Sequence, residues 1–107
     1  MSVPLPAPVQ AVFDATNADD TDAFLDSFTA DGVVDDWGRE FHGREAIKGW
    51  SDGENIGVRA RLTPTAVETR GGEHVVTATV AGGGFNGPSH FAFRVDGDRV
   101  SRMTIRA

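Results

Sequence analysis

The sequence predicts an α+β fold in which three N-terminal helices pack on a curved antiparallel sheet. The first observation behind this prediction is a change in the spacing of apolar residues near Val58, from the helical period of about 3.6 to the period of about 2 that is typical of strands. The second is the order of the elements, since helices come first and hairpin-linked strands follow. Elements in this order are expected to form a helical layer on one face of a sheet.

The length and composition indicate one globular domain over residues 1–107. Apolar residues make up 39% of the chain and charged residues 24%, which is typical of a folded protein rather than a disordered one. The chain contains no internal repeat, linker or low-complexity tract. A chain of this size can bury a single core.

Two short helices are predicted at the start of the chain. The first follows Pro8, and one of its faces is formed by Val9, Val12, Phe13 and Thr16. The second is expected to be capped by Asp20 or Thr21, because a side-chain oxygen there can accept from the unpaired N–H groups of the first turn. The apolar face of this second helix contains Phe24, Leu25 and Phe28, and residues 31–32, Asp-Gly, are expected to end it.

A short hairpin and a third helix are expected next. Residues 32–37 are predicted to form a strand and residues 39–42 its antiparallel return. Gly43 then breaks the chain, and residues 44–50 form a helix with Ile47 and Trp50 turned inward. Residues 52–55 are predicted to be a loop.

The rest of the chain is predicted to be an antiparallel meander. Its four strands are expected at residues 58–69, 75–81, 89–95 and 99–106. Gly71-Gly72 and Asp96-Gly97 mark hairpin turns. Pro64 lacks a backbone N–H, so we expect it on an edge strand or at a bulge.

Charge and composition exclude several classes of function. The net charge of −6 disfavours nucleic acid and anionic membranes as partners, and the basic residues are scattered. The absence of cysteine excludes disulfides and thiolate chemistry. Residues Met1 to Pro6 lack the basic and apolar regions of a leader peptide, so we expect a soluble cytoplasmic protein.

No metal or cofactor is expected. The trio of Asp36, His42 and Glu45 matches no standard metal-ligand spacing. The glycines at positions 82–84 are not followed by the Lys-Ser or Lys-Thr of a phosphate-binding loop. No nicotinamide, flavin or nucleophile-elbow motif occurs in the chain.

Three stretches resemble a known family. They are ATNADDTDAF at residues 15–24, FTADGVVDD with FHGREAI at residues 28–47, and GFNGPSHFAFRVDGDRV at residues 84–100. In this order, over nearly the whole chain, they resemble the nuclear transport factor 2-like superfamily. The resemblance is to its small SnoaL-like branch, which includes relatives of polyketide cyclases and ketosteroid isomerases.

The resemblance implies a cone-shaped barrel with a deep apolar pocket, and a homodimer. Ketosteroid isomerases place a carboxylate base at the end of the first strand, and the matching residue here is Asp36. They also use a tyrosine of the first helix and a protonated aspartate of a late strand, which correspond here to Val12 and Ser89. The chain contains no tyrosine, so it departs from the ketosteroid isomerase pattern.

Asp36 is the first candidate for a catalytic residue, with His42 as its proton partner. Alternate residues of a strand face opposite sides, so Asp36 shares a face with Val34 and Asp35 shares one with Val33. If Val34 faces the pocket, Asp36 does too, and apolar walls would desolvate it as a general base requires. The alternatives are that both acids are solvated at a strand end and that His42 is a surface histidine. The residues expected to line the pocket are Phe13, Trp37, Trp50, Ser89, Phe91 and Phe93.

Three functions are compatible with these features. The protein could bind a small apolar metabolite and transfer a proton in a cofactor-free reaction of the isomerase or cyclase kind. It could instead bind such a molecule without catalysis. The third hypothesis is a dimeric interaction module that binds its partner through the outer face of the sheet. This face is weakly polar and contains Thr77, Thr79, His90 and Ala92.

Overall fold

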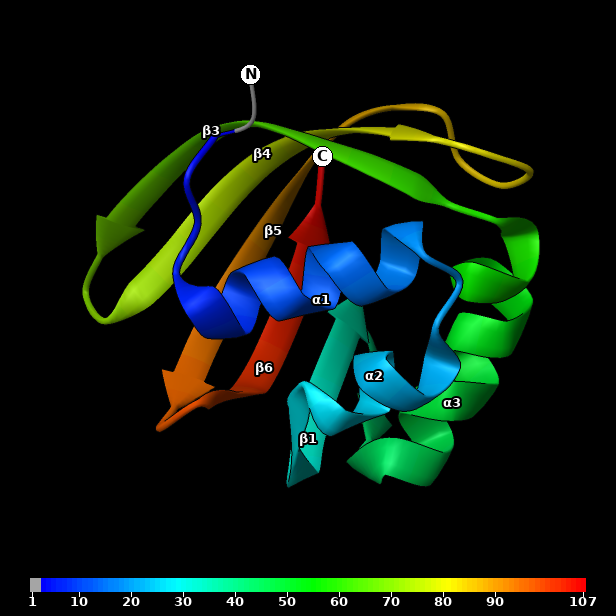
Figure 1. Cartoon of the computed structure of the whole chain (residues 1–107), viewed down its shortest axis with the longest axis horizontal. Coiled ribbons are helices and arrows are strands. Elements are labelled where there is room, and N and C mark those ends of the chain that lie inside the picture. The colour runs from blue at the N-terminus through cyan, green and yellow to red at the C-terminus, as the bar shows by residue number, and fades with distance from the viewer. Residues whose placement is uncertain (1–2) are drawn as a thin grey trace.

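A computed structural model describes residues 3–107 of the chain (Figure 1). Met1 and Ser2, which belong to the opening segment considered above, lie outside the described residues. The helices are α1 (Ala7–Asn17), α2 (Thr21–Asp26), α3 (Gly43–Glu54) and the 3-10 turn η1 (Ile56–Val58). The strands are β1 (Phe28–Asp36), β2 (Arg39–His42), β3 (Arg61–Arg70), β4 (Glu73–Ala81), β5 (Gly87–Asp96) and β6 (Arg99–Arg106).

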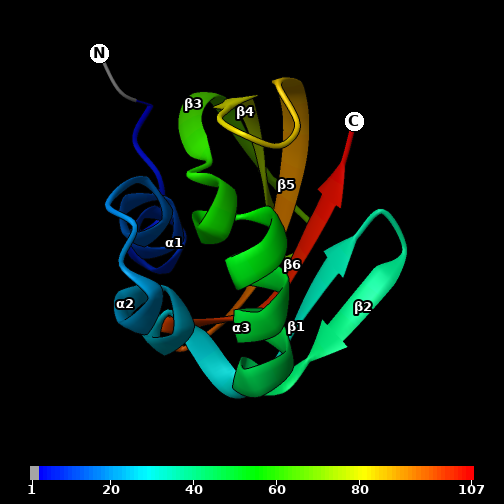
Figure 2. The same ribbon diagram turned by 90° about the vertical axis from the view of Figure 1, so that its right-hand side faces the viewer.

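The predicted α+β class is confirmed, with the three α-helices on one side of a six-stranded curved sheet (Figures 1 and 2). The strand order is β2-β1-β6-β5-β4-β3, so β2 and β3 are the edges and the sheet does not close. The meander from β3 to β6 is antiparallel as predicted. One pair differs, because β1 runs parallel to β6 and the sheet is therefore mixed.

Pro64 lies where its missing N–H is tolerated. Strand β3 is an edge strand, and its register with β4 shifts between Pro64 and Ala66. Both sequence-based expectations for this proline are met, because it sits on an edge and beside a bulge.

The core lies between the helices and the concave face of the sheet. Its largest fully buried side chains include Phe13, Phe24, Phe28, Phe93 and Ile47. The Phe13 ring of α1 packs against Phe91 and Phe93 of β5, with centroid separations of 5.6 and 5.7 Å. Helix α1 is thus held across the middle of the sheet by aromatic contacts (Figure 1).

Three predicted boundaries are corrected. Helix α2 ends at Asp26 rather than near Gly32, because Phe28 already pairs with Val100 in the sheet and Gly32 lies inside β1. Helix α3 continues through residues 52–54, which were predicted to be a loop. Strand β3 begins at Arg61 rather than Val58, since η1 and the left-handed Arg59 come first.

Candidate functional site

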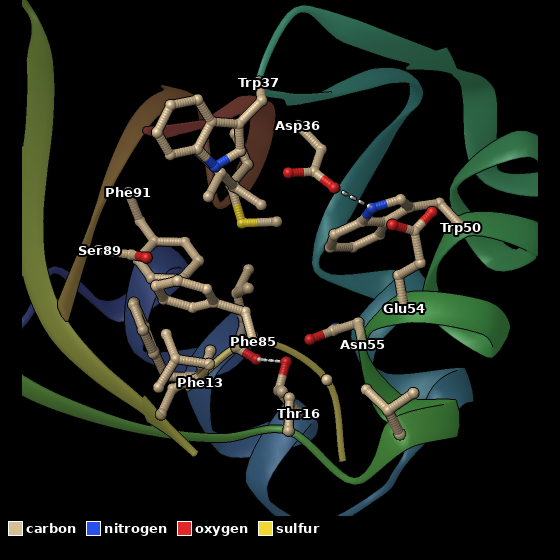
Figure 3. Close-up of a pocket in the computed structure, with 18 of the residues that line it drawn as sticks. Phe13, Thr16, Asp36, Trp37, Trp50, Glu54, Asn55, Phe85, Ser89 and Phe91 are labelled. Carbon is tan, nitrogen blue, oxygen red and sulfur yellow. Dashed lines mark hydrogen bonds between the residues drawn. The ribbon is translucent and has the colours of Figure 1, made fainter. Parts of the chain in front are cut away.

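A cavity of about 220 Å³ opens between the helices and the concave face of the sheet (Figure 3). Both the helices and the sheet contribute to its walls, which come from α1, the end of α3, η1, the end of β1, the β1–β2 turn, β3, β4, the β4–β5 loop, β5 and β6. All six residues predicted to line a pocket lie in its wall: Phe13, Trp37, Trp50, Ser89, Phe91 and Phe93. A cavity of this kind, apolar with a few polar groups, is typical of small-molecule sites.

The chain's aromatic side chains gather at this cavity. Of the seven Phe and two Trp in the sequence, six line it, and both tryptophans are among them. Aliphatic walls are added by Val12, Leu62, Val80, Met103 and Ile105. The cavity therefore offers flat aromatic faces as well as general apolar contact.

Asp36 stands at the rim of the cavity, on the face that strand alternation predicts. Val34, two residues before it, is fully buried, while the Asp36 side chain is 15% exposed. One carboxylate oxygen, Oδ2, accepts from the indole Nε1 of Trp50 at 3.1 Å and from Arg39 at 2.5 Å. Within residues 3–107 the second oxygen has no hydrogen-bond partner, and Figure 3 shows it turned toward the cavity.

Arg39 joins the two carboxylates that line the cavity. Besides Asp36, its guanidinium donates to both oxygens of Glu54, at 2.9 and 2.6 Å. This hydrogen bonding lowers the pKa of Glu54 below its usual value, which keeps that side chain negatively charged at neutral pH. These ion pairs connect the β1–β2 turn to the C-terminal end of α3 at the opening of the cavity.

Three polar side chains are buried in the wall. The Thr16 hydroxyl donates to the Val12 carbonyl at 2.9 Å. The Asn55 side-chain N–H lies 3.5 Å from Ser51 Oγ, and its amide oxygen points into the cavity (Figure 3). Ser89 is only 3% exposed, and its hydroxyl has no partner in the described part of the chain. Because Ser89 lines the cavity, its hydroxyl can donate a hydrogen bond to a bound molecule or accept one from it.

Two large apolar side chains form the outer rim. Trp37 and Phe85 are each 59% exposed, although both also line the cavity. Trp37 has a φ of +55° and Gly38 a φ of +90°, as a two-residue type I′ turn requires. Asn-Gly is the usual pair for this turn, and a tryptophan is uncommon in the left-handed region.

Several lining residues were not predicted from the sequence, and Glu54, Asn55 and Phe85 are the ones among them with polar or aromatic side chains that matter most for the site. Glu54 and Asn55 lie in the segment that the sequence predicts to be a loop, and no motif or spacing there indicates a binding role. Phe85 did carry a signal, because it is a lone large apolar residue in the glycine-rich β4–β5 segment. Asn86 fixes that segment by donating to the carbonyls of Gly82 and Gly84.

The neighbouring acid, Asp35, has a structural role on the opposite face of the sheet. It is 5% exposed and accepts from Arg102 at 2.8 Å, from Arg106 at 3.0 Å and from the Gly38 backbone N–H at 2.7 Å. The hydrogen bond from Arg106 is the largest cause that lowers its pKa. Asp35 is therefore held as a charged anchor of β1 on β6.

His42 is not brought to Asp36, which corrects the expected proton pair. His42 pairs with Val33 across β1 and β2, so it shares the face of Asp35 rather than that of Asp36. Its ring contacts Glu40 at 2.9 Å, the side chain is 64% exposed, and it does not line the cavity.

Neither a metal cluster nor a membrane span is found over residues 3–107. No group of three or more His, Cys, Asp or Glu side chains is arranged to hold a metal ion there. None of the helices of that segment has the length and apolar character needed to cross a bilayer.

Comparison with known proteins gives one family. Residues 9–103 match the family model of the SnoaL-like domain. No curated protein matches the chain. Many solved structures share its fold, among them the following three.

These structures share the fold at 19–29% sequence identity. A proposed polyketide cyclase from Sinorhizobium meliloti is 29% identical with a TM-score of 0.83, and the match covers 95% of each chain. A protein of ketosteroid isomerase-like fold from Catenulispora acidiphila, in complex with trimethylamine, is 25% identical with a TM-score of 0.80, covering 97% of this chain and 87% of the other. A Δ5-3-ketosteroid isomerase from a Mycobacterium species is 19% identical with a TM-score of 0.78, covering 94% and 90%.

Proposed function

The chain belongs to the SnoaL-like domain family, and we propose that it binds a small, largely apolar molecule in the cavity and accepts a proton from it through Asp36, without a cofactor. The reaction class is the proton transfer of isomerases and cyclases. Phe13, Trp50 and Phe91 form the walls against which such a molecule packs.

The observation that carries this proposal is the arrangement of the Asp36 carboxylate. Trp50 and Arg39 both donate to Oδ2, which fixes the orientation of the group. The second oxygen faces the apolar space, where a bound molecule would come within hydrogen-bond distance of it (Figure 3). A base that is held in place and shielded from bulk water is what proton abstraction requires.

Two of the similar structures support the proposal. The Catenulispora acidiphila protein is in complex with trimethylamine, so a protein of this fold and similar sequence binds a small molecule. The Sinorhizobium meliloti protein is a proposed polyketide cyclase, which is consistent with the reaction class. Both matches span nearly the whole of this chain.

Binding without catalysis is the second candidate function, and the oxyanion positions favour it. The residues that match the tyrosine and the late aspartate of ketosteroid isomerases are Val12 and Ser89, and both line the cavity. Valine cannot donate a hydrogen bond, so a developing enolate would find only the Ser89 hydroxyl at these two positions. We also propose that the protein forms a homodimer, as the family resemblance implies, and that it is located in the cytoplasm.

The proton-transfer role is tested by deuterium exchange at the α-carbon of acetylcyclohexane in D2O, followed by NMR. We expect the wild-type protein to accelerate exchange and Asp36→Asn to lose about 100-fold or more of this acceleration, the usual contribution of a general base. The control is Asp98→Asn, which makes the same charge change at a side chain that is 92% exposed. Exchange that survives in a folded Asp36→Asn protein contradicts the base assignment. A ketone that binds without exchange supports the binding-only alternative.

A further inference from the structure

We propose that the molecule held in the cavity is an organic cation, an amine that is protonated at neutral pH and carries apolar substituents. This inference rests on the proposed function only in requiring the cavity to be a ligand site, and it does not require proton transfer. Three properties of the cavity lead to it: the sign of its charge, its aromatic faces and its hydrogen-bonding groups.

The charged side chains that line the cavity are both negative. They are Asp36 and Glu54, and no Lys, Arg or His is part of the wall. Arg39 reaches these carboxylates from the β1–β2 hairpin and offsets one of the two charges, which leaves the mouth with a net negative charge. The whole protein adds to this field with its net charge of −6. Such a site attracts a cation and repels a carboxylate or phosphate ligand.

The faces that surround the space are aromatic. Figure 3 shows Trp37, Phe85 and Phe91 on one side and Trp50 on the other, with Asp36 at the rim between the two indoles. The face of an aromatic ring carries negative potential, and tryptophan binds cations more strongly than phenylalanine does. Aromatic rings combined with a carboxylate suit an alkylammonium group, whose surface is apolar while its charge is positive.

The hydrogen-bonding groups favour a ligand that donates. The free oxygen of Asp36 and the amide oxygen of Asn55 both point into the space (Figure 3) and can only accept. The donors available to a ligand are neutral, namely the indole N–H of Trp37 and the hydroxyl of Ser89, both on residues that line the cavity. An ammonium N–H directed at Asp36 would make the strongest hydrogen bond that this cavity can form.

The test compares three probes with the same number of heavy atoms. They are N,N-dimethylcyclohexylamine, which is a cation at neutral pH, acetylcyclohexane, which is neutral, and cyclohexanecarboxylate, which is an anion. Affinity is measured by isothermal titration calorimetry on the full chain at low and at physiological salt. We expect the amine to bind at least tenfold more tightly than the ketone, and the carboxylate to bind most weakly.

Two Asp→Asn variants show which carboxylate is responsible for the preference for the amine. Asp36→Asn should weaken binding of the amine about tenfold or more while it changes binding of the ketone little, because the lost interaction is a charge-assisted hydrogen bond. Asp98→Asn changes the net charge equally at an exposed site away from the cavity and should leave both affinities unchanged. Circular dichroism verifies that each variant is folded.

The outcomes separate the two proposals. If the ketone or the carboxylate binds as tightly as the amine, the cavity remains a ligand site but its ligand is not a cation. If Asp98→Asn weakens the amine as much as Asp36→Asn does, net charge rather than the cavity selects the amine, and the inference is wrong. If none of the three probes binds, the cavity does not take molecules of this size, and the proposed function fails together with this inference.

Discussion

Trp37 combines a backbone conformation that is uncommon for a bulky residue with a position in the cavity wall. A bulky side chain in the left-handed region costs about 1–3 kcal/mol when nothing compensates for it. At 59% exposure, the indole recovers only part of that cost by burial. The position in the β1–β2 turn would suit asparagine better, because Asn-Gly is the favoured pair of a type I′ turn.

This gives a prediction that separates binding from stability. Trp37→Asn should leave the free energy of unfolding unchanged or raise it by up to about 1 kcal/mol, because the turn strain is relieved. The same change should weaken binding of N,N-dimethylcyclohexylamine roughly threefold to tenfold, through the loss of an aromatic face. Urea unfolding and calorimetry measure the two effects. Trp37→Phe, which keeps a ring, should retain most of the affinity. If Trp37→Asn binds the amine as tightly as the wild type does, the ring does not contact the ligand.

The two adjacent acids show what the sequence can predict about single residues. The alternation of a strand correctly placed Asp36 on the face of Val34 and Asp35 on the other face. It could not show that Arg102 and Arg106, which follow Asp35 by 67 and 71 positions, donate hydrogen bonds to it. Nor could it place His42, whose face depends on the register of β2 against β1.

At the scale of elements, the junction between α3 and η1 shapes one wall of the cavity. A Cβ built on Gly57 would overlap the backbone carbonyl of Asp52, so only glycine allows η1 to fold back on the last turn of α3. Asn55, which points into the cavity, lies between these two elements. The position of the wall therefore depends on Gly57.

Two glycine substitutions test this dependence. Gly57→Ala should destabilise the fold by about 1–3 kcal/mol, the usual cost of a forced overlap in a packed region. Gly49→Ala lies inside α3 and meets nothing within 4 Å, so it should stabilise the protein by about 0.5–1 kcal/mol through helix propensity. Thermal unfolding of the two variants and the wild type measures both. Equal effects of the two substitutions would refute the packing argument for Gly57.

The sequence predicted the presence of helices and strands better than the residues at which they begin and end. The hairpin at Gly71-Gly72 and the cap at Asp20 followed from local chemistry and are present in the structure. The last hairpin is also present, but its two turn residues are Gly97 and Asp98, because Asp96 still pairs with Arg99. The end of α2 and the start of β3 were misplaced, because Gly32 and Val58 fit either state locally. Tertiary pairing, as between Phe28 and Val100, decided these boundaries.

At the scale of the whole molecule, the parallel pairing of β1 with β6 assembles the site. It sets Asp36 opposite Ile105 in the register, and Ile105 lines the cavity beside it. A meander alone would not have predicted this contact between the two halves of the chain. The aromatic residues of the pocket were predictable because they are few and apolar, whereas the Arg39–Glu54 pair depends on how the β1–β2 turn meets α3 (Figure 2).

The two tryptophans allow the most direct measurement of the central claim, which is that a small molecule binds inside the cavity beside Asp36. Both of the chain's tryptophans line that cavity, so the two indole N–H signals in a ¹H–¹⁵N spectrum are reporters built into the site. During titration with N,N-dimethylcyclohexylamine we expect both signals to shift and saturate together, with the larger change at Trp50, whose N–H donates to Asp36. If calorimetry shows binding while both indole signals stay unmoved, the molecule binds elsewhere and the cavity is not the ligand site.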